Sequence, residues 1–128
     1  MPDPFVKSLL AEVARHLEAL VRDGTVAAID LRSLPLSTDD RARLEAALGQ
    51  GEVKVTIDAA GESELHETAY AGVWWVRHFG AGRQLLTERI EITPLPKVLA
   101  AAPEDIAAGA RRLAMNVKAL AEGEKAHA

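Results

Sequence analysis

The segment HETAYAGVWWVRH, residues 66–78, gathers most of the side chains in this 128-residue chain that could do chemistry. Two histidines, His66 and His78, enclose a glutamate and both tryptophans of the sequence, Trp74 and Trp75. Imidazole is a common metal ligand, a carboxylate can act as a general base, and tryptophan is a frequent anchor at protein interfaces. The segment therefore raises three hypotheses: a metal site, a catalytic site and a docking surface.

A metal site depends on how the segment folds as a hairpin. A turn at residues 70–72 would place residue 69 opposite 73 and residue 66 opposite 76. In an antiparallel hairpin, each residue further from the turn on one strand pairs with the residue equally far along the other strand. His66 and His78 would then share a sheet face, roughly 7–8 Å apart at diagonal positions. Two imidazoles could bind a metal there, but only weakly, because the predicted face offers no third ligand. The alternative is that both histidines are ordinary polar strand residues.

A catalytic site would depend on Glu67, which this register places on the other face, beside Trp75 and near Arg77. A tryptophan wall could raise the pKa of the carboxyl group and suit it as the base of a hydrolase or isomerase. The simpler interpretation is a cross-strand ion pair between Glu67 and Arg77. No nucleophile, oxyanion donor or known catalytic motif accompanies Glu67 in the sequence. We therefore predict no catalytic residue and no enzymatic activity.

The docking hypothesis depends on the aromatic residues. Strand alternation sends Trp74 and Trp75 to opposite faces, so that one is expected in the core and the other outside, with Tyr70 at the turn. Exposed aromatic side chains are enriched among interface anchors. The predicted partner-binding residues are Glu67, Thr68, Tyr70, Trp74, Trp75 and Arg77.

Composition excludes several classes of function. The absence of cysteine excludes disulfides, thiolate catalysis and cysteine-bound metal clusters. A net charge of -4 without a basic cluster argues against nucleic-acid binding. No apolar run is long enough for a membrane span, and the N-terminus lacks the pattern of a signal peptide. We expect a cytoplasmic protein that needs no cofactor and binds neither nucleic acid nor membranes.

The spacing of apolar residues predicts an α+β fold. A spacing of three and four predicts helices, and a spacing of two predicts strands. The helices are expected at about 4–22, 38–48 and 103–121, and the strands at about 52–58, 64–69, 73–79 and 84–92. The strands would form a four-stranded antiparallel meander, with the helices packed mainly on one face.

Three local features complete this prediction. Ser37 and Asp40 resemble a capping box at the start of the second helix. Residues 25–34 suggest a short strand or an extended segment that is not counted in the sheet. The length of the chain suits a single domain over residues 1–128, with a frayed tail at 123–128.

The order of several short motifs is similar to that of a known family. LPLS precedes a helix, GEV opens a strand, ETxxxGVWxV spans the hairpin, and IEI with nearby prolines closes the sheet. Over about residues 26–108 these motifs resemble the C-terminal domain of the HupH/HyaF family of hydrogenase expression/formation proteins. The hairpin motif positions are Glu67, Thr68, Gly72, Val73 and Trp74, and none of them carries a catalytic signature.

The resemblance implies an accessory role in nickel–iron hydrogenase maturation. The protein would be a chaperone or scaffold that binds a hydrogenase precursor subunit or another maturation factor by protein–protein interaction. Many family members are longer and carry more than one such domain, so this chain would be a single-domain copy, which leaves a homodimer open. The alternative function is a small metal-binding or metal-delivery protein that uses His66 and His78.

Overall fold

The computed structural model describes residues 4–58 and 61–126. The chain divides into two compact units, Met1–Pro96 and Lys97–Ala128. The first unit contains two α-helices, a short 3-10 helix, η1 (Ala81–Arg83), and a sheet. The second contains another short 3-10 helix, η2 (Lys97–Leu99), and the last α-helix. The candidate site lies within the first unit.

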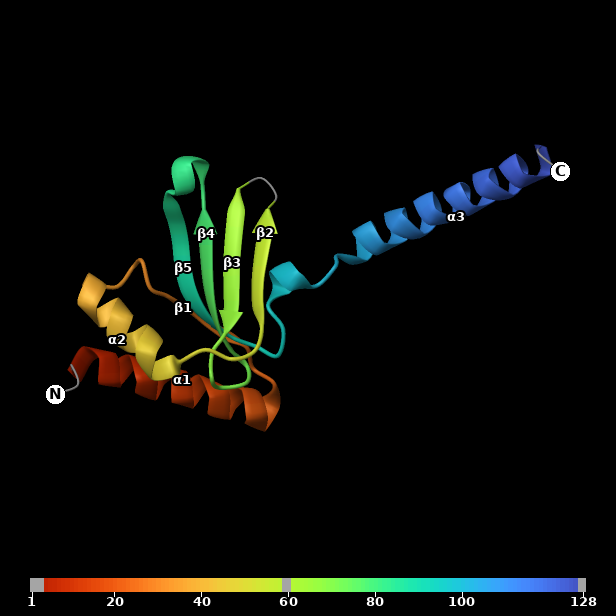
Figure 1. The fold of residues 1–128 in the computed structure, drawn as a ribbon. Helices are drawn as coiled ribbons and strands as arrows, with labels where there is room; N and C mark the ends of the chain where they lie inside the picture. Colours follow the sequence, from red (N-terminus) through yellow and green to blue (C-terminus); the bar gives the residue numbers. More distant parts are fainter. Residues whose placement is uncertain (1–3, 59–60, 127–128) are drawn as a thin grey trace. The chain divides into compact units, whose positions relative to one another are not determined.

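A five-stranded antiparallel sheet forms the centre of the first unit (Figure 1). Its strands are β1 (Ala27–Asp30), β2 (Lys54–Asp58), β3 (Glu62–Glu67), β4 (Val73–Phe79) and β5 (Leu85–Ile92). The strand order is β1-β5-β4-β3-β2, so the predicted meander is present and β1 extends it beyond β5. The prediction of four strands is wrong by this one strand. β1 is short and pairs with a strand far along the chain, which a local pattern does not reveal.

The first two helices form where they were predicted. They are α1 (Pro4–Asp23) and α2 (Thr38–Leu48). The capping box is present: the hydroxyl group of Ser37 accepts a hydrogen bond from the backbone N–H of Asp40 at 3.0 Å. The Asp40 carboxylate accepts one from the backbone N–H of Ser37 at 3.1 Å. These bonds satisfy N–H groups that the start of a helix leaves without helical partners.

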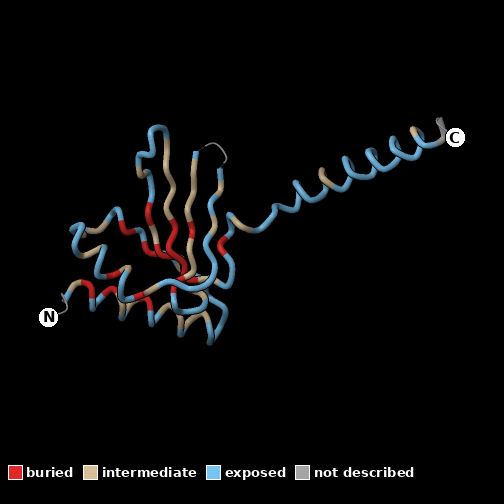
Figure 2. The backbone as a smooth tube through the Cα atoms, in the orientation of Figure 1, coloured by how far each residue is buried: buried red, intermediate tan, exposed pale blue. Residues whose placement is uncertain are grey.

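Both helices cover the same face of the sheet. The buried residues there form one apolar cluster, which comprises Val6, Leu9 and Val13 of α1, Leu44 and Leu48 of α2, and Ile29, Leu31, Val73, Trp75, Ile90 and Ile92. Figure 2 shows the buried backbone concentrated at the end of the sheet next to α1 and α2. The opposite end of the sheet, towards the β4–β5 connection, carries mostly half-buried and exposed residues.

The third helix, α3, runs from Pro103 to Ala126 and is longer than the predicted 103–121. It continues through Gly123, because a glycine costs a helix only about 1 kcal/mol and does not end it unaided. The described part of the expected tail at 123–128 is therefore helical as far as Ala126, while residues 127–128 lie outside the described residues. The packing of this helix on the sheet, and a single domain over residues 1–128, stay predictions.

The register of the hairpin differs from the predicted register by one residue. Glu67 lies opposite Trp74, and His66 lies opposite Trp75. A one-residue slip moves every side chain of a strand to the other face. The cause is the turn, which has four residues between Thr68 and Val73: the Thr68 N–H donates to the Val73 carbonyl oxygen at 2.9 Å. The predicted pairing of residues 69 and 73 is therefore wrong.

Candidate docking site at the hairpin turn

Tyr70 is exposed on the turn between β3 and β4, with 53% of its surface accessible. Its backbone is held by the buried hydroxyl group of Thr68, which accepts from the Tyr70 N–H and donates to the Tyr70 carbonyl oxygen, both at 3.2 Å. Val73 also donates its N–H to that carbonyl at 3.0 Å. Gly72 closes the turn at a φ of +88°, a conformation that side-chain-bearing residues rarely adopt. The turn therefore presents an aromatic ring on a backbone that is already ordered.

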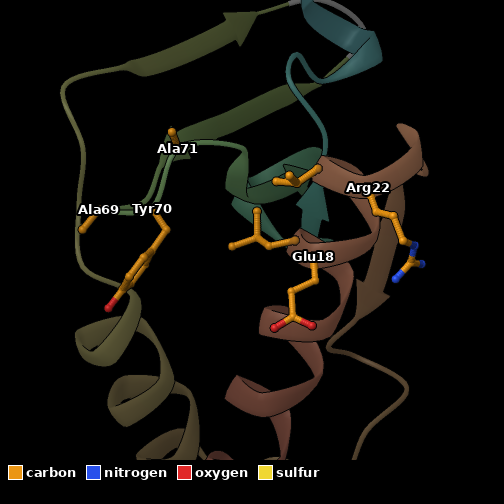
Figure 3. Close-up of a pocket in the computed structure, with 7 residues that line it drawn as sticks. Glu18, Arg22, Ala69, Tyr70 and Ala71 are labelled. Atoms are coloured by element: carbon orange, nitrogen blue, oxygen red, sulfur yellow. The ribbon is translucent and has the colours of Figure 1, made fainter.

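A groove of about 600 Å³ lies between this turn and α1. It is lined by Leu17, Glu18, Val21, Arg22, Ala69, Tyr70 and Ala71. Figure 3 shows Tyr70 on the turn and Glu18 and Arg22 on α1. These two α1 side chains supply one charge of each sign to the lining of the groove. A second cavity of about 250 Å³ between α1 and α2 shares Leu17 and Tyr70 with the groove. Tyr70 therefore lies at the junction of two mostly apolar depressions.

Val21 adds to the apolar surface of the groove. Although Val21 continues the helical spacing of apolar residues along α1, 87% of its surface is accessible. Val21 lies in the last turn of α1, beyond Val6, Leu9 and Val13, the buried residues of that helix. Concave apolar surfaces with a few polar groups are the usual form of ligand and peptide sites.

Neither tryptophan is exposed, which corrects the predicted outward ring. Trp74 and Trp75 expose only 4% and 1% of their surfaces. Trp75 lies in the helix-covered core, and Trp74 lies on the other face, where its indole N–H donates to the Thr93 carbonyl oxygen at 3.2 Å. Both rings are buried and both N–H groups have partners within the chain, so neither is available to anchor another protein.

The indole N–H of Trp75 donates to a buried glutamate that the sequence analysis missed. Glu88 of β5 exposes 2% of its surface and accepts this bond at 3.0 Å. The same carboxylate oxygen accepts from Arg77 Nε at 2.7 Å. Arg41 of α2 lies 3.1 Å from the other oxygen as an ion pair, although without the geometry of a hydrogen bond. Buried carboxylates need such partners, so this contact attaches α2 to the sheet.

Arg77 completes the network on the α2 side. It donates to Glu45 at 2.9 Å, and its guanidinium group lies 5.3 Å from the centre of the Trp75 ring. Burial lowers the pKa of Arg77, but its hydrogen bonds to Glu88 and Glu45 outweigh this, so the pKa is raised above its ordinary value. Arg77 therefore pairs with Glu88 and Glu45, and the predicted pair with Glu67 is wrong. One signal was available in the sequence: strand alternation puts Glu88 on the same side as Ile90 and Ile92.

The two histidines lie on opposite faces of the sheet. His66 stacks on Trp75, with ring centroids 6.4 Å apart and planes 8° apart. Its Nε2 atom is buried without a hydrogen-bond partner among the described residues. His78 lies on the other face, with Nδ1 2.6 Å from the Ser63 hydroxyl oxygen. Burial lowers the pKa of both imidazoles below the ordinary value of 6.5.

This separation removes the geometric basis of a shared metal site at His66 and His78. Within residues 4–58 and 61–126, no three histidine or carboxylate side chains form a group that could hold a metal ion. Of the predicted partner-binding residues, Thr68, Trp74 and Trp75 are buried and Glu67 and Arg77 are half-buried, while Tyr70 is exposed. The turn thus replaces the sheet face as the candidate docking site.

Comparison with known proteins identifies the family. The model of the HupH hydrogenase expression protein, C-terminal conserved region, matches residues 6–120. The chain belongs to this family. The matched region includes the hairpin, α2 and most of α1 and α3, so the resemblance inferred from the motifs is confirmed.

Two curated relatives share this region. The hydrogenase expression/formation protein HoxQ of Azotobacter vinelandii is 36% identical over 110 residues, which cover 86% of this chain and 38% of HoxQ. The hydrogenase-1 operon protein HyaF of Escherichia coli K12 is 37% identical over 119 residues, which cover 93% of this chain and 40% of HyaF. The chain thus spans about two fifths of the length of these relatives.

A solved structure shares the fold. It is the hydrogenase expression protein HupH from Thiobacillus denitrificans, with a TM-score of 0.85 and 39% sequence identity. The match covers 88% of this chain and 94% of the solved chain. None of the described helices is both long and apolar enough to cross a membrane.

Proposed function

We propose that this chain is a non-enzymatic accessory protein of nickel–iron hydrogenase maturation, a chaperone or scaffold. It binds a hydrogenase precursor subunit or another maturation factor in the cytoplasm, and the groove at the hairpin turn is its docking site. Membership of the HupH family supports the process, since relatives are named for hydrogenase expression and formation. The observation that carries the docking site is the exposed, backbone-anchored Tyr70 beside an apolar groove.

The chemistry of the groove favours an apolar partner segment. Leu17, Val21 and the Tyr70 ring offer an apolar surface, and Glu18 and Arg22 offer one charge of each sign beside it. An apolar anchor that enters the groove gains burial, while polar groups beside it can meet the two charges. Because the turn is held by hydrogen bonds before any partner arrives, binding orders little additional backbone.

The lining of the groove also supports a binding role rather than catalysis. Its titratable side chains are Glu18, Arg22 and Tyr70, and no nucleophile–base pair lies among the lining residues. The buried carboxylate of Glu88 is already bound by Trp75 and Arg77, and it does not line the groove.

Affinity purification with the tagged chain tests this function in a host that produces a nickel–iron hydrogenase. The wild-type chain should retain a hydrogenase precursor subunit or another maturation factor, and Tyr70→Ala should reduce its recovery by about tenfold or more, as expected for an aromatic anchor. Leu86→Ala is the matched control, because Leu86 is also 53% exposed but lies on β5, outside the groove. Circular dichroism should show unchanged unfolding of both variants.

The two parts of the proposal fail in different ways. Wild-type recovery by Tyr70→Ala would refute the docking site and leave the process intact. If the wild-type chain retained neither hydrogenase subunits nor maturation factors, the proposed process itself would be refuted.

A further inference from the structure

The outer edge of β2 is an open strand edge. β2 is the last strand in the sheet order, and among the described residues no strand pairs with its second side. Val53, just before β2, accepts a hydrogen bond from the Glu67 N–H at 2.9 Å, so its polar backbone groups point to β3. Backbone direction alternates along a strand, so Lys54, Thr56 and Asp58 turn their N–H and C=O groups outward. Such a row is a template for pairing with another strand.

The sequence of this edge is complementary to itself. If two copies of β2 meet in antiparallel orientation with Thr56 opposite Thr56, Lys54 of each copy lies opposite Asp58 of the other. Val55 then lies opposite Ile57 of the second copy. These pairings follow from the strand KVTID alone, because antiparallel partners are placed symmetrically about the central residue.

The charges at this edge lack partners that a second copy would provide. Lys54 and Asp58 are exposed, and neither makes an ion pair among the residues that the structure describes. Within the sheet Asp58 lies opposite Glu62, a like charge, and Lys54 lies opposite His66. Like charges directly across a sheet are destabilising and opposite charges are stabilising. Glu62 already pairs with Arg83, whereas Asp58 has no ion pair among the described residues, so a lysine from a second copy would supply the opposite charge that Asp58 lacks.

The apolar side chains of β2 fit the same arrangement. Val55 lies opposite Leu65, which is 1% exposed, on the face that α1 and α2 do not cover. Val55 and Ile57 are half-buried at the edge of this face. Pairing with a second copy would place each of them against an apolar side chain and continue the row across the interface.

The other edge of the sheet lacks this complementarity. β1 has the sequence AAID, and four residues give it no central residue on which two copies could align. Aligned end to end in antiparallel orientation, its one charge, Asp30, would lie opposite Ala27. The single charge of β1 therefore does not favour pairing with a second copy, and in this the β1 edge differs from the β2 edge.

We propose that β2 is a homodimer interface, in which the β2 edges of two copies pair in antiparallel register about Thr56 and join the two sheets into one. This inference does not depend on the proposed function, since it concerns the opposite side of the sheet from β1 and residues outside the groove. A strand pair this short buries less than the roughly 1,200 Å² of standard interfaces, so the dimer forms reversibly with concentration.

Sedimentation of the full chain over a concentration series tests the interface. The wild-type mass should rise from the monomer value of 13.7 kDa towards twice that value. Thr56→Pro should remain monomeric, because proline removes a central N–H donor that points away from β3, where a folded edge strand tolerates it. Thr56→Ala is the control, since it keeps the N–H and should still dimerise.

Charge reversal tests the register and does not depend on proline being tolerated. Lys54→Asp or Asp58→Lys alone should raise the dimer dissociation constant by about tenfold, because each variant places like charges opposite each other twice per interface. The double variant should restore wild-type dimerisation. A wild-type chain that stays monomeric throughout, or a dimer unaffected by both single reversals, would overturn the proposal.

Discussion

The strands and the turn of one hairpin, β3–β4, serve opposite purposes. In the strands, Trp74 and Trp75 are buried, and their N–H groups bind Thr93 and Glu88 of the same chain. In the turn, Tyr70 is half exposed while its backbone is held by Thr68 and Val73. All three aromatic residues lie within six positions of one another, yet their neighbours divide them into two groups. An aromatic residue indicates a docking site only where its ring lacks partners within the fold.

Replacing a buried aromatic residue of the strands and the exposed one of the turn should give the largest difference in stability. Trp75→Ala should lower the free energy of unfolding by about 3–5 kcal/mol, because it empties a large core position. Tyr70→Ala should change it by less than about 0.5 kcal/mol, the usual range for surface positions. Chemical denaturation measures both values. Equal losses of stability would show that the turn is as structural as the strands.

Removing the buried carboxylate should have the next largest effect. Glu88→Ala leaves the half-buried Arg77 and Arg41 without their shared anion, and breaking such a pair costs about 3 kcal/mol or more. Glu62→Ala is the control, because its ion pair with Arg83 lies nearer the surface and contributes about 1 kcal/mol or less. Denaturation midpoints at constant ionic strength provide the comparison. A loss for Glu88→Ala no larger than that for Glu62→Ala would contradict a role in attaching α2.

The pH dependence of stability should be smaller but specific to the strands. Burial lowers the pKa of His66, opposed by the charge of Glu45 and reinforced by those of Arg77 and Lys54. The unfolded chain therefore binds protons more readily, and the contribution of His66 is fully present above its ordinary pKa of 6.5 and lost as pH falls below it. His66→Gln should flatten the decline in unfolding free energy between about pH 7 and 5.

Denaturation at several pH values checks this effect, with Tyr70→Ala as a control that should keep the wild-type slope. His78 also has a lowered pKa, through burial and the charge of Arg89, and so contributes to the same decline. A residual slope in His66→Gln is therefore expected. If that slope equalled the wild-type slope, burial would not control the titration of His66.

Local patterns predicted a large part of this fold. The predicted helices at about 4–22 and 38–48, the capping box at Ser37 and the strand at 73–79 depend on residues close together in the sequence, and the structure has each of them. The motifs around Thr68 and Gly72 also identified the family. Such features are encoded by periodicity and by turn or cap residues, so a single sequence carries them.

Contacts between residues far apart in the sequence were not predicted. β1 joins β5, and Glu88 meets Arg77 and Arg41, through contacts between segments that no local pattern connects. The prediction also assigned the side chains of β3 to the wrong faces relative to those of β4, and the reason is simpler. One additional residue in the turn reverses every side chain of β3, and the hydrogen bonds of Thr68 decide that length.

The sequence by itself determined most of the elements, the family and the presence of an aromatic hairpin. Tertiary structure decided which of its aromatic residues remains accessible, because burial depends on what the other segments cover. It placed both indole rings inside, separated His66 from His78, and left Tyr70 beside a groove formed with α1. The sequence specifies which side chains are present, but strand register and packing determine which of them are accessible.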